Sequence, residues 1–167
     1  MAKFILIFLL IFNPLLFSDT KSLKVTESFL IDQYIGNTRN LNQLIGYYLT
    51  FDATLPVSFY MGTSWAITGD YGGYGTASFG PKFSFPLSDH WLISFATLVG
   101  VGGHAALPLG NGFHTWFQTG LHYYFSQNIH VKLNYGTLHY TSGHYTVDTL
   151  SVAFNYSYDI FFTNRPY

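Results

Sequence analysis

Apolar and polar residues alternate with a period of two through most of the chain, which is typical of β-strands with two different faces. In residues 57–67, the bulky side chains of Phe59 and Met61 share one face, and smaller or polar side chains such as Ser58 occupy the other. The pattern predicts eight strands, at residues 28–37, 43–52, 57–67, 74–86, 90–102, 112–125, 129–141 and 146–160.

The second face of these strands carries polar groups. They include Lys82, Gln118, Lys132, Asn134 and Asn155. A polar face opposite a continuous apolar face suits a narrow barrel with a polar interior and a wall that contacts lipid. We therefore expect an all-β fold, a single eight-stranded antiparallel transmembrane β-barrel. A soluble lipocalin-like barrel, with the two faces inverted, is the alternative.

Composition favours the membrane barrel. Aromatic residues make up 20% of the chain and charged residues 9%, against roughly 25% charged residues in soluble domains. The outer surface of a soluble barrel would therefore be short of charge. The net charge of −1 provides no basic field that would gather nucleic acid. Cysteine is absent from the sequence, which excludes a disulfide framework and a thiolate metal site.

The first residues resemble an export signal. Lys3 provides a positive charge, the 14 residues from Phe4 to Phe17 are almost wholly apolar, and Ser18 is a small residue at a candidate cleavage point. The apolar run is shorter than the roughly 20 residues of a membrane-spanning helix. We expect a cleaved signal peptide over 1–18 and an outer-membrane barrel over 19–167, in a Gram-negative-type cell.

The connections between the predicted strands differ in length. Those at 52–56, 86–90 and 126–128 are short, and those at 69–75 and 103–112 are longer and rich in glycine. Outer-membrane barrels have short periplasmic turns and longer external loops. Because successive connections of an antiparallel barrel lie at opposite ends, the connection around Gly143 falls on the external side.

The last two strands carry polar residues on their apolar faces. The odd face of strand 129–141 ends in His139 and Thr141, and the even face of strand 146–160 begins near Asp148. Opposite residues of a hairpin point to the same face. A two-residue turn at Gly143–His144 would place His139 opposite Asp148, and a shifted turn would place Thr141 opposite Asp148. Either register predicts that the three side chains gather at the external edge of the lipid-facing wall.

A carboxylate, an imidazole and a hydroxyl in one patch are the parts of a hydrolase. Alternatively, they form an interfacial belt at headgroup depth, where polar side chains cost little. Alternation directs Ser142 into the lumen, and a bulge at Gly143 would be needed to turn it outward as an alternative nucleophile. His114, His122 and His130 fall on the lumen face, and no pair of histidines forms a persuasive metal site.

The segment from Val131 to Gly143, followed by Val147–Ser151, resembles the end of the outer-membrane lipid A 3-O-deacylases, the PagL family. The resemblance implies a lipid-facing site that removes an ester-linked acyl chain from lipid A without metal or cofactor. By position, His139 matches the general base, Thr141 the serine nucleophile and Asp148 the acidic residue that orients the histidine. Ser142 stands where the family has an asparagine associated with the oxyanion.

The sequence departs from the family pattern at three positions. Thr141 replaces serine, Ser142 replaces asparagine and Asp148 replaces glutamate. Loss of one oxyanion donor can lower the rate by about 10²–10³. Two functions therefore stay open: a divergent hydrolase acting on outer-leaflet lipid A or phospholipid, and a non-catalytic barrel that serves envelope integrity or adhesion. The sequence also leaves open whether the barrel forms a homodimer.

Overall fold

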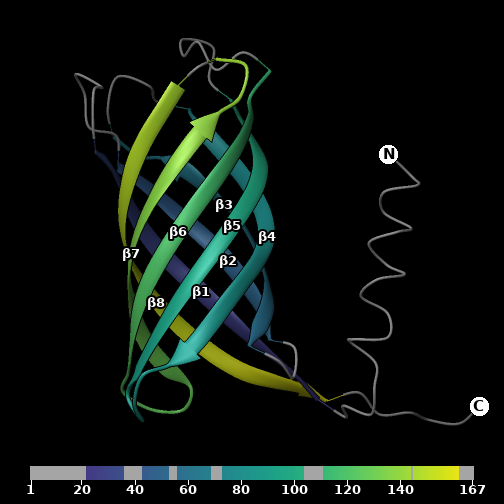
Figure 1. Cartoon of the computed structure of the whole chain (residues 1–167), viewed down its shortest axis with the longest axis vertical. Coiled ribbons are helices and arrows are strands. Elements are labelled where there is room, and N and C mark those ends of the chain that lie inside the picture. Colours follow the sequence, from purple (N-terminus) through teal and green to yellow (C-terminus); the bar gives the residue numbers. More distant parts are fainter. Residues whose placement is uncertain are drawn as a thin grey trace, which may run out of the picture.

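The computed structural model describes residues 22–35, 43–52, 56–68, 73–103, 111–143 and 145–161. They form eight strands, β1 (Ser22–Ile35), β2 (Gln43–Asp52), β3 (Val57–Ala66), β4 (Gly75–Pro86), β5 (Trp91–Gly103), β6 (Phe113–Tyr124), β7 (Ile129–Tyr140) and β8 (Tyr145–Phe161). Each strand pairs with its neighbours, and β8 returns to β1, so the sheet closes into a barrel (Figure 1). The predicted all-β fold is confirmed.

Closure depends on the pairing of the first and last strands. β1 and β8 are antiparallel, and their register runs from Ser22 opposite Phe161 to Ile35 opposite Asp148. The residues described contain no helix long and apolar enough to cross a membrane. The predicted signal peptide at 1–18 lies outside the described residues.

The first strand differs most from the sequence prediction, which placed it at 28–37. β1 begins six residues earlier, at Ser22, and ends at Ile35. β8 supplies the reason, because it continues to Phe161 and provides backbone partners for the early residues of β1. Glu27 interrupts the apolar face of β1, and this carboxylate concealed the alternation in the sequence.

The two faces of the barrel have opposite chemistry. The outer wall exposes large apolar side chains on every strand, among them Phe29, Ile45, Phe117 and Phe154. The lumen contains buried polar side chains, including Asp32, Gln118 and the predicted lumen histidines His114, His122 and His130. An exposed apolar wall with a polar interior is the arrangement expected of a barrel in lipid.

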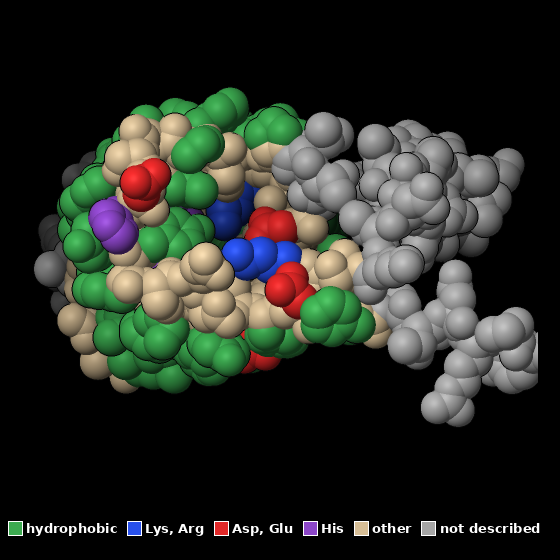
Figure 2. Space-filling view, turned by 90° about the horizontal axis from the view of Figure 1, so that it is seen from below, with side chains coloured by type: hydrophobic (Ala, Val, Ile, Leu, Met, Phe, Trp, Pro, Cys, Tyr) green, Lys and Arg blue, Asp and Glu red, His purple; other side chains and the backbone are tan. Residues whose placement is uncertain are grey.

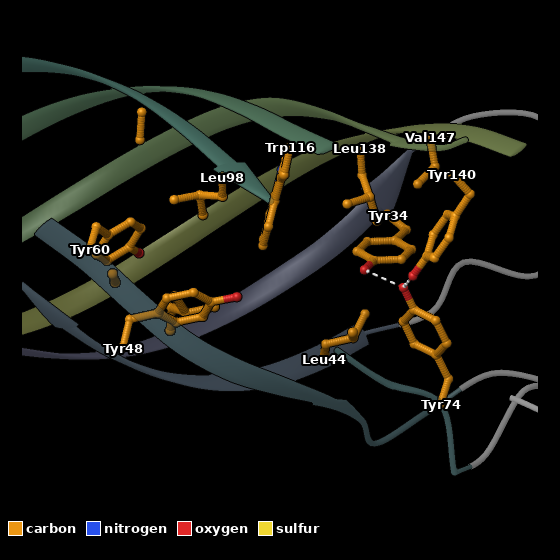
Figure 3. Packing of buried hydrophobic residues seen from close by; sticks show 13 residues of the cluster. Tyr34, Leu44, Tyr48, Tyr60, Tyr74, Leu98, Trp116, Leu138, Tyr140 and Val147 are labelled. Atoms are coloured by element: carbon orange, nitrogen blue, oxygen red, sulfur yellow. Dashed lines mark hydrogen bonds between the residues drawn. The ribbon is translucent and has the colours of Figure 1, made fainter. Parts of the chain in front are cut away.

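Aromatic side chains fill the upper lumen. The hydroxyls of Tyr34 and Tyr74 lie 3.2 Å apart, and Tyr74 also hydrogen bonds Tyr140 (Figure 3). Further down, the rings of Tyr48 and Tyr60 stack with centroids 4.9 Å apart. Tyr34 of β1, Tyr140 of β7 and Tyr74, which comes just before β4, connect different parts of the wall across the lumen, whereas Tyr48 and Tyr60 come from the neighbouring strands β2 and β3.

The lower lumen is more highly charged. The Lys82 and Lys132 ammonium groups lie 5.7 and 4.8 Å from the centroid of the Tyr60 ring. A cavity of about 550 Å³ opens at the lower mouth, where Lys24, Asp89 and Tyr124 are among its lining residues. Charged side chains surround this mouth when the barrel is seen from below (Figure 2).

The two ends of the barrel can be assigned from the connections. The short turns at 87–90 and 125–128 join strands at the end where β1 begins and β8 ends. The longer connections at 36–42, 67–74 and 104–112 join strands at the opposite end, where the four-residue β7–β8 connection also lies. Since outer-membrane barrels place short turns in the periplasm, the β7–β8 connection is external.

Close packing of a lumen glycine provides a test of this interior. A Cβ atom at Gly62 would lie 2.3 Å from the Tyr48 ring, whereas one at Gly103 would meet nothing within 4 Å. We predict that Gly62→Ala lowers the free energy of unfolding by about 1–3 kcal/mol, because the added methyl collides with the Tyr48 ring and with the backbone oxygen of Tyr47. Urea unfolding of the folded protein in lipid vesicles measures the change.

Gly103→Ala is the matched control, and we expect it to leave the unfolding free energy within about 0.5 kcal/mol of the wild-type value. Equal effects of the two substitutions would contradict the described packing of Tyr48 over Gly62.

Candidate functional site

Five polar side chains occupy the outer wall of the β7–β8 hairpin near its external end. Tyr135, Thr137 and His139 come from β7, and Thr146 and Asp148 come from β8. We call these five residues the hairpin patch. Tyr135, His139 and Thr146 are exposed, and Thr137 and Asp148 are half-buried. The predicted outward orientation of His139 and Asp148 agrees with this burial pattern.

The predicted hairpin registers are wrong. Neither Thr141 nor His139 lies opposite Asp148: His139 pairs with Thr146, and Thr137 pairs with Asp148. β7 ends at Tyr140 and β8 begins at Tyr145, so the turn is longer than the two residues expected. The Tyr140 side chain is buried in the lumen and bonds Tyr74 across the barrel, which fixes the end of β7 before residue 141.

The observed register gives each ionisable group of the hairpin patch a hydroxyl partner. Nδ1 of His139 lies 2.8 Å from Oγ1 of Thr146. The Thr137 hydroxyl donates to Oδ1 of Asp148 at 2.7 Å, and the Tyr135 hydroxyl lies near the same carboxylate. His139 and Asp148 are therefore diagonal neighbours on one face, because Asp148 lies two residues along β8 from Thr146, the residue opposite His139.

Thr141, the nucleophile implied by the family resemblance, is exposed in the turn and engages the neighbouring strand. Its hydroxyl donates to the Phe113 carbonyl at 3.3 Å, and its backbone N–H donates to the same oxygen at 3.1 Å. Thr141 follows His139 by two residues, but its hydroxyl is bonded to β6 and not to His139.

Ser142 does not lie in the lumen as alternation predicted. It is exposed in the turn, because β7 has already ended at Tyr140. Its hydroxyl donates to Oδ1 of Asn111 at 2.7 Å, and the Asn111 N–H donates to Ser142 Oγ at 2.9 Å. Ser142 therefore ties the β7–β8 turn to Asn111, two residues before the start of β6.

The arrangement provides a base next to a hydroxyl. In a three-residue relay, a carboxylate orients the imidazole and the imidazole activates the nucleophile. Here the imidazole contacts Thr146, while Asp148 accepts hydrogen bonds from other side chains. The hairpin patch therefore contains a histidine–threonine pair with a carboxylate one diagonal step away.

Sequence reasoning missed Thr146 and Thr137 as members of the site. Alternation places both on the same outer face as His139, so their orientation could have been found. Their hydrogen-bond partners could not, because a shift of register by two residues keeps every side chain on its face and changes every partner.

Two of the lumen histidines, His114 and His122, have hydrogen-bond partners within the barrel. Nε2 of His114 lies 2.9 Å from Ser78 Oγ, and Nε2 of His122 lies 2.8 Å from Ser94 Oγ. In the part of the chain that the structure describes, no three His, Cys, Asp or Glu side chains are grouped to hold a metal ion. The lumen histidines are part of the polar packing of the interior.

No protein-family model and no curated protein matches the sequence. Among solved structures, a de novo designed transmembrane β-barrel matches with a TM-score of 0.61, 11% identity, and coverage of 84% of this chain and 98% of that chain. Neisserial surface protein A (NspA) matches with a TM-score of 0.56 and 9% identity, over 86% of this chain and 100% of that chain.

The N-terminal β-barrel domain of Pseudomonas aeruginosa OprF also matches, with a TM-score of 0.53, 14% identity, and coverage of 82% of this chain and 98% of that chain. At these identities the likeness concerns the fold. The chain has the fold of the small outer-membrane barrels, and its apolar outer wall indicates that the barrel lies in a membrane.

The hairpin register can be tested by disulfide formation, since the chain has no cysteine of its own. We predict that His139→Cys combined with Thr146→Cys forms a disulfide readily, because directly opposite residues lie within the Cα separation that a disulfide requires. Thr141→Cys combined with Thr146→Cys should form little. Gel mobility after mild oxidation of the folded protein measures both, and preferential formation of the 141–146 disulfide would contradict the register.

Proposed function

We propose that this protein is an acyl-ester hydrolase of the outer membrane, and that the hairpin patch is its active site. The observation that carries the proposal is the 2.8 Å contact between His139 Nδ1 and Thr146 Oγ1 on the outer wall. A base within hydrogen-bond distance of a hydroxyl is the arrangement needed to activate an oxygen nucleophile.

In the proposed reaction, His139 takes the proton of the Thr146 hydroxyl as the oxygen attacks the ester carbonyl carbon. The bond from the acyl carbon to the alcohol oxygen breaks, and the imidazolium returns its proton to the departing alcohol. A water molecule, deprotonated by His139, then cleaves the acyl-threonine and restores the Thr146 hydroxyl. The negative charge of Asp148, one diagonal step away, stabilises the imidazolium by Coulomb attraction.

The position of the hairpin patch suggests the substrate. It lies at the external end of the barrel on the surface that faces lipid, so the ester must belong to a lipid of the outer leaflet. Leu150, Val152 and Leu133 are exposed just below it and would contact acyl chains. The resemblance to lipid A 3-O-deacylases supports lipid A as the substrate, with His139 as the base.

The resemblance and the geometry differ over the nucleophile. The resemblance assigns it to Thr141, whereas the contact with His139 belongs to Thr146. We favour Thr146, because its hydroxyl already lies at the imidazole.

A non-catalytic barrel is the second candidate function. One observation favours it: the Asp148 carboxylate accepts the Thr137 hydroxyl instead of orienting His139. On this alternative the hairpin patch is an interfacial belt that hydrogen bonds lipid headgroups, and the protein contributes to envelope integrity or adhesion.

Release of fatty acid from lipid A by the folded protein in mixed micelles tests the proposal. We predict that His139→Ala lowers the rate by about 10²–10⁴, because the general base is lost. Thr146→Val keeps the shape of the side chain and removes its hydroxyl, so it should reduce release to background. Thr141→Val should retain most of the activity.

Thr97→Val, on the outer wall of β5, is the control and should release fatty acid at the wild-type rate. Loss of activity in Thr141→Val but not in Thr146→Val would return the nucleophile to Thr141. Absence of release by the wild-type protein from both lipid A and phospholipid would exclude the hydrolase and leave the non-catalytic barrel.

A further inference from the structure

A second ionisable group faces the lipid from the opposite end of the barrel. Glu27 lies on the outer face of β1, since its neighbours Thr26 and Ser28 are buried in the lumen. In the strands described, Glu27 and Asp148 are the carboxylates on the outer wall, and no lysine or arginine lies on that wall. An ionisable residue facing lipid marks a candidate functional site whose partner must be identified.

Two tyrosine hydroxyls approach Glu27. The Tyr158 hydroxyl of β8 donates to Glu27 Oε1 at 3.0 Å, and the Tyr47 hydroxyl of β2 lies near the Glu27 carboxylate. In the described strands, no lysine or arginine side chain of the outer wall pairs with this carboxylate.

Aromatic rings surround this carboxylate. The Tyr47 ring lies 5.0 Å from the Phe29 ring, and the Tyr158 ring lies 6.1 Å from the Tyr156 ring. Tyr156 is also directly opposite Glu27 in the register of β1 and β8. A carboxylate among aromatic faces suits an organic cation, which gains from both ion pairing and cation–π attraction.

The register places the site near the periplasmic edge of the wall. Glu27 lies opposite Leu49, three residues before β2 ends at Asp52. On the other side, Tyr156 lies opposite Ile129, the first residue of β7 after a periplasmic turn. Tyrosines are enriched at this depth, where lipid headgroups meet the acyl chains.

We propose that Glu27, Tyr47 and Tyr158 bind the primary ammonium group of an ethanolamine phospholipid in the inner leaflet. The ammonium N–H groups donate to the carboxylate oxygens, and the aromatic rings flank the cation. A trimethylammonium headgroup lacks N–H donors and fits less well, and a glycerol headgroup has no positive charge. The site lies on the same side of the barrel as the hairpin patch, below it on the adjoining strands, and would fix the depth of that wall in the membrane.

Native mass spectrometry of the full chain, folded in one detergent and titrated with phospholipids of identical acyl chains, tests this site. Wild-type protein should retain phosphatidylethanolamine at least about threefold better than phosphatidylglycerol, with phosphatidylcholine in between. Glu27→Gln should reduce the ratio to about one. Tyr158→Phe keeps the ring and removes one donor, so it should lower the ratio less.

Asp89→Asn is the matched control, because it removes one negative charge from a periplasmic turn and should preserve the wild-type ratio. Equal retention of the three lipids by the wild-type protein would overturn the proposal, and so would an unchanged preference in Glu27→Gln. If Glu27→Gln fails to fold, the wild-type comparison of ethanolamine with glycerol headgroups still decides the question.

Discussion

The hydrogen bonds between β1 and β8 are the constraint on which the rest of the structure depends. In lipid, an unpaired backbone N–H or C=O costs several kcal/mol, so a sheet that crosses the membrane must have no open edge. Pairing from Ser22 opposite Phe161 to Ile35 opposite Asp148 removes that edge. The pairing also fixes the neighbours of β8, and through them the positions of both lipid-facing polar sites.

Once the barrel is closed, alternation assigns every side chain to the lumen or the wall. The lumen accepts charged and aromatic groups because they find partners there, as the Tyr34–Tyr74–Tyr140 hydroxyls and the lysines over Tyr60 do. Polar groups on the wall have no such surroundings. His139, Asp148 and Glu27 are each bonded to hydroxyls of neighbouring strands, which lowers the cost of placing them next to lipid and leaves them available to lipid groups at the two interfaces.

The sequence predicted the fold and the facing of site residues better than it predicted their contacts. A period of two is visible in single strands such as β3, and it correctly placed His139 and Asp148 on the wall and His122 in the lumen. Where a wall residue is polar, as at Glu27, the start of the strand was hidden. The hairpin contacts depend on where Tyr140 is anchored across the barrel, which is a tertiary interaction that no local pattern reveals. Both predicted registers differ from the observed one by an even number of residues, so the face was right and the partners were wrong.

The measurement that tests the central claim most directly is a nitroxide scan along β7 in lipid bilayers, with single cysteines at successive positions from 131 to 139. Labels at odd positions, including 139, should collide readily with oxygen dissolved in lipid, and labels at even positions should be protected in the lumen. The inverted pattern, with protection at 139 and oxygen access at 138, would mean that His139 faces the interior and that no lipid-facing site exists on this hairpin.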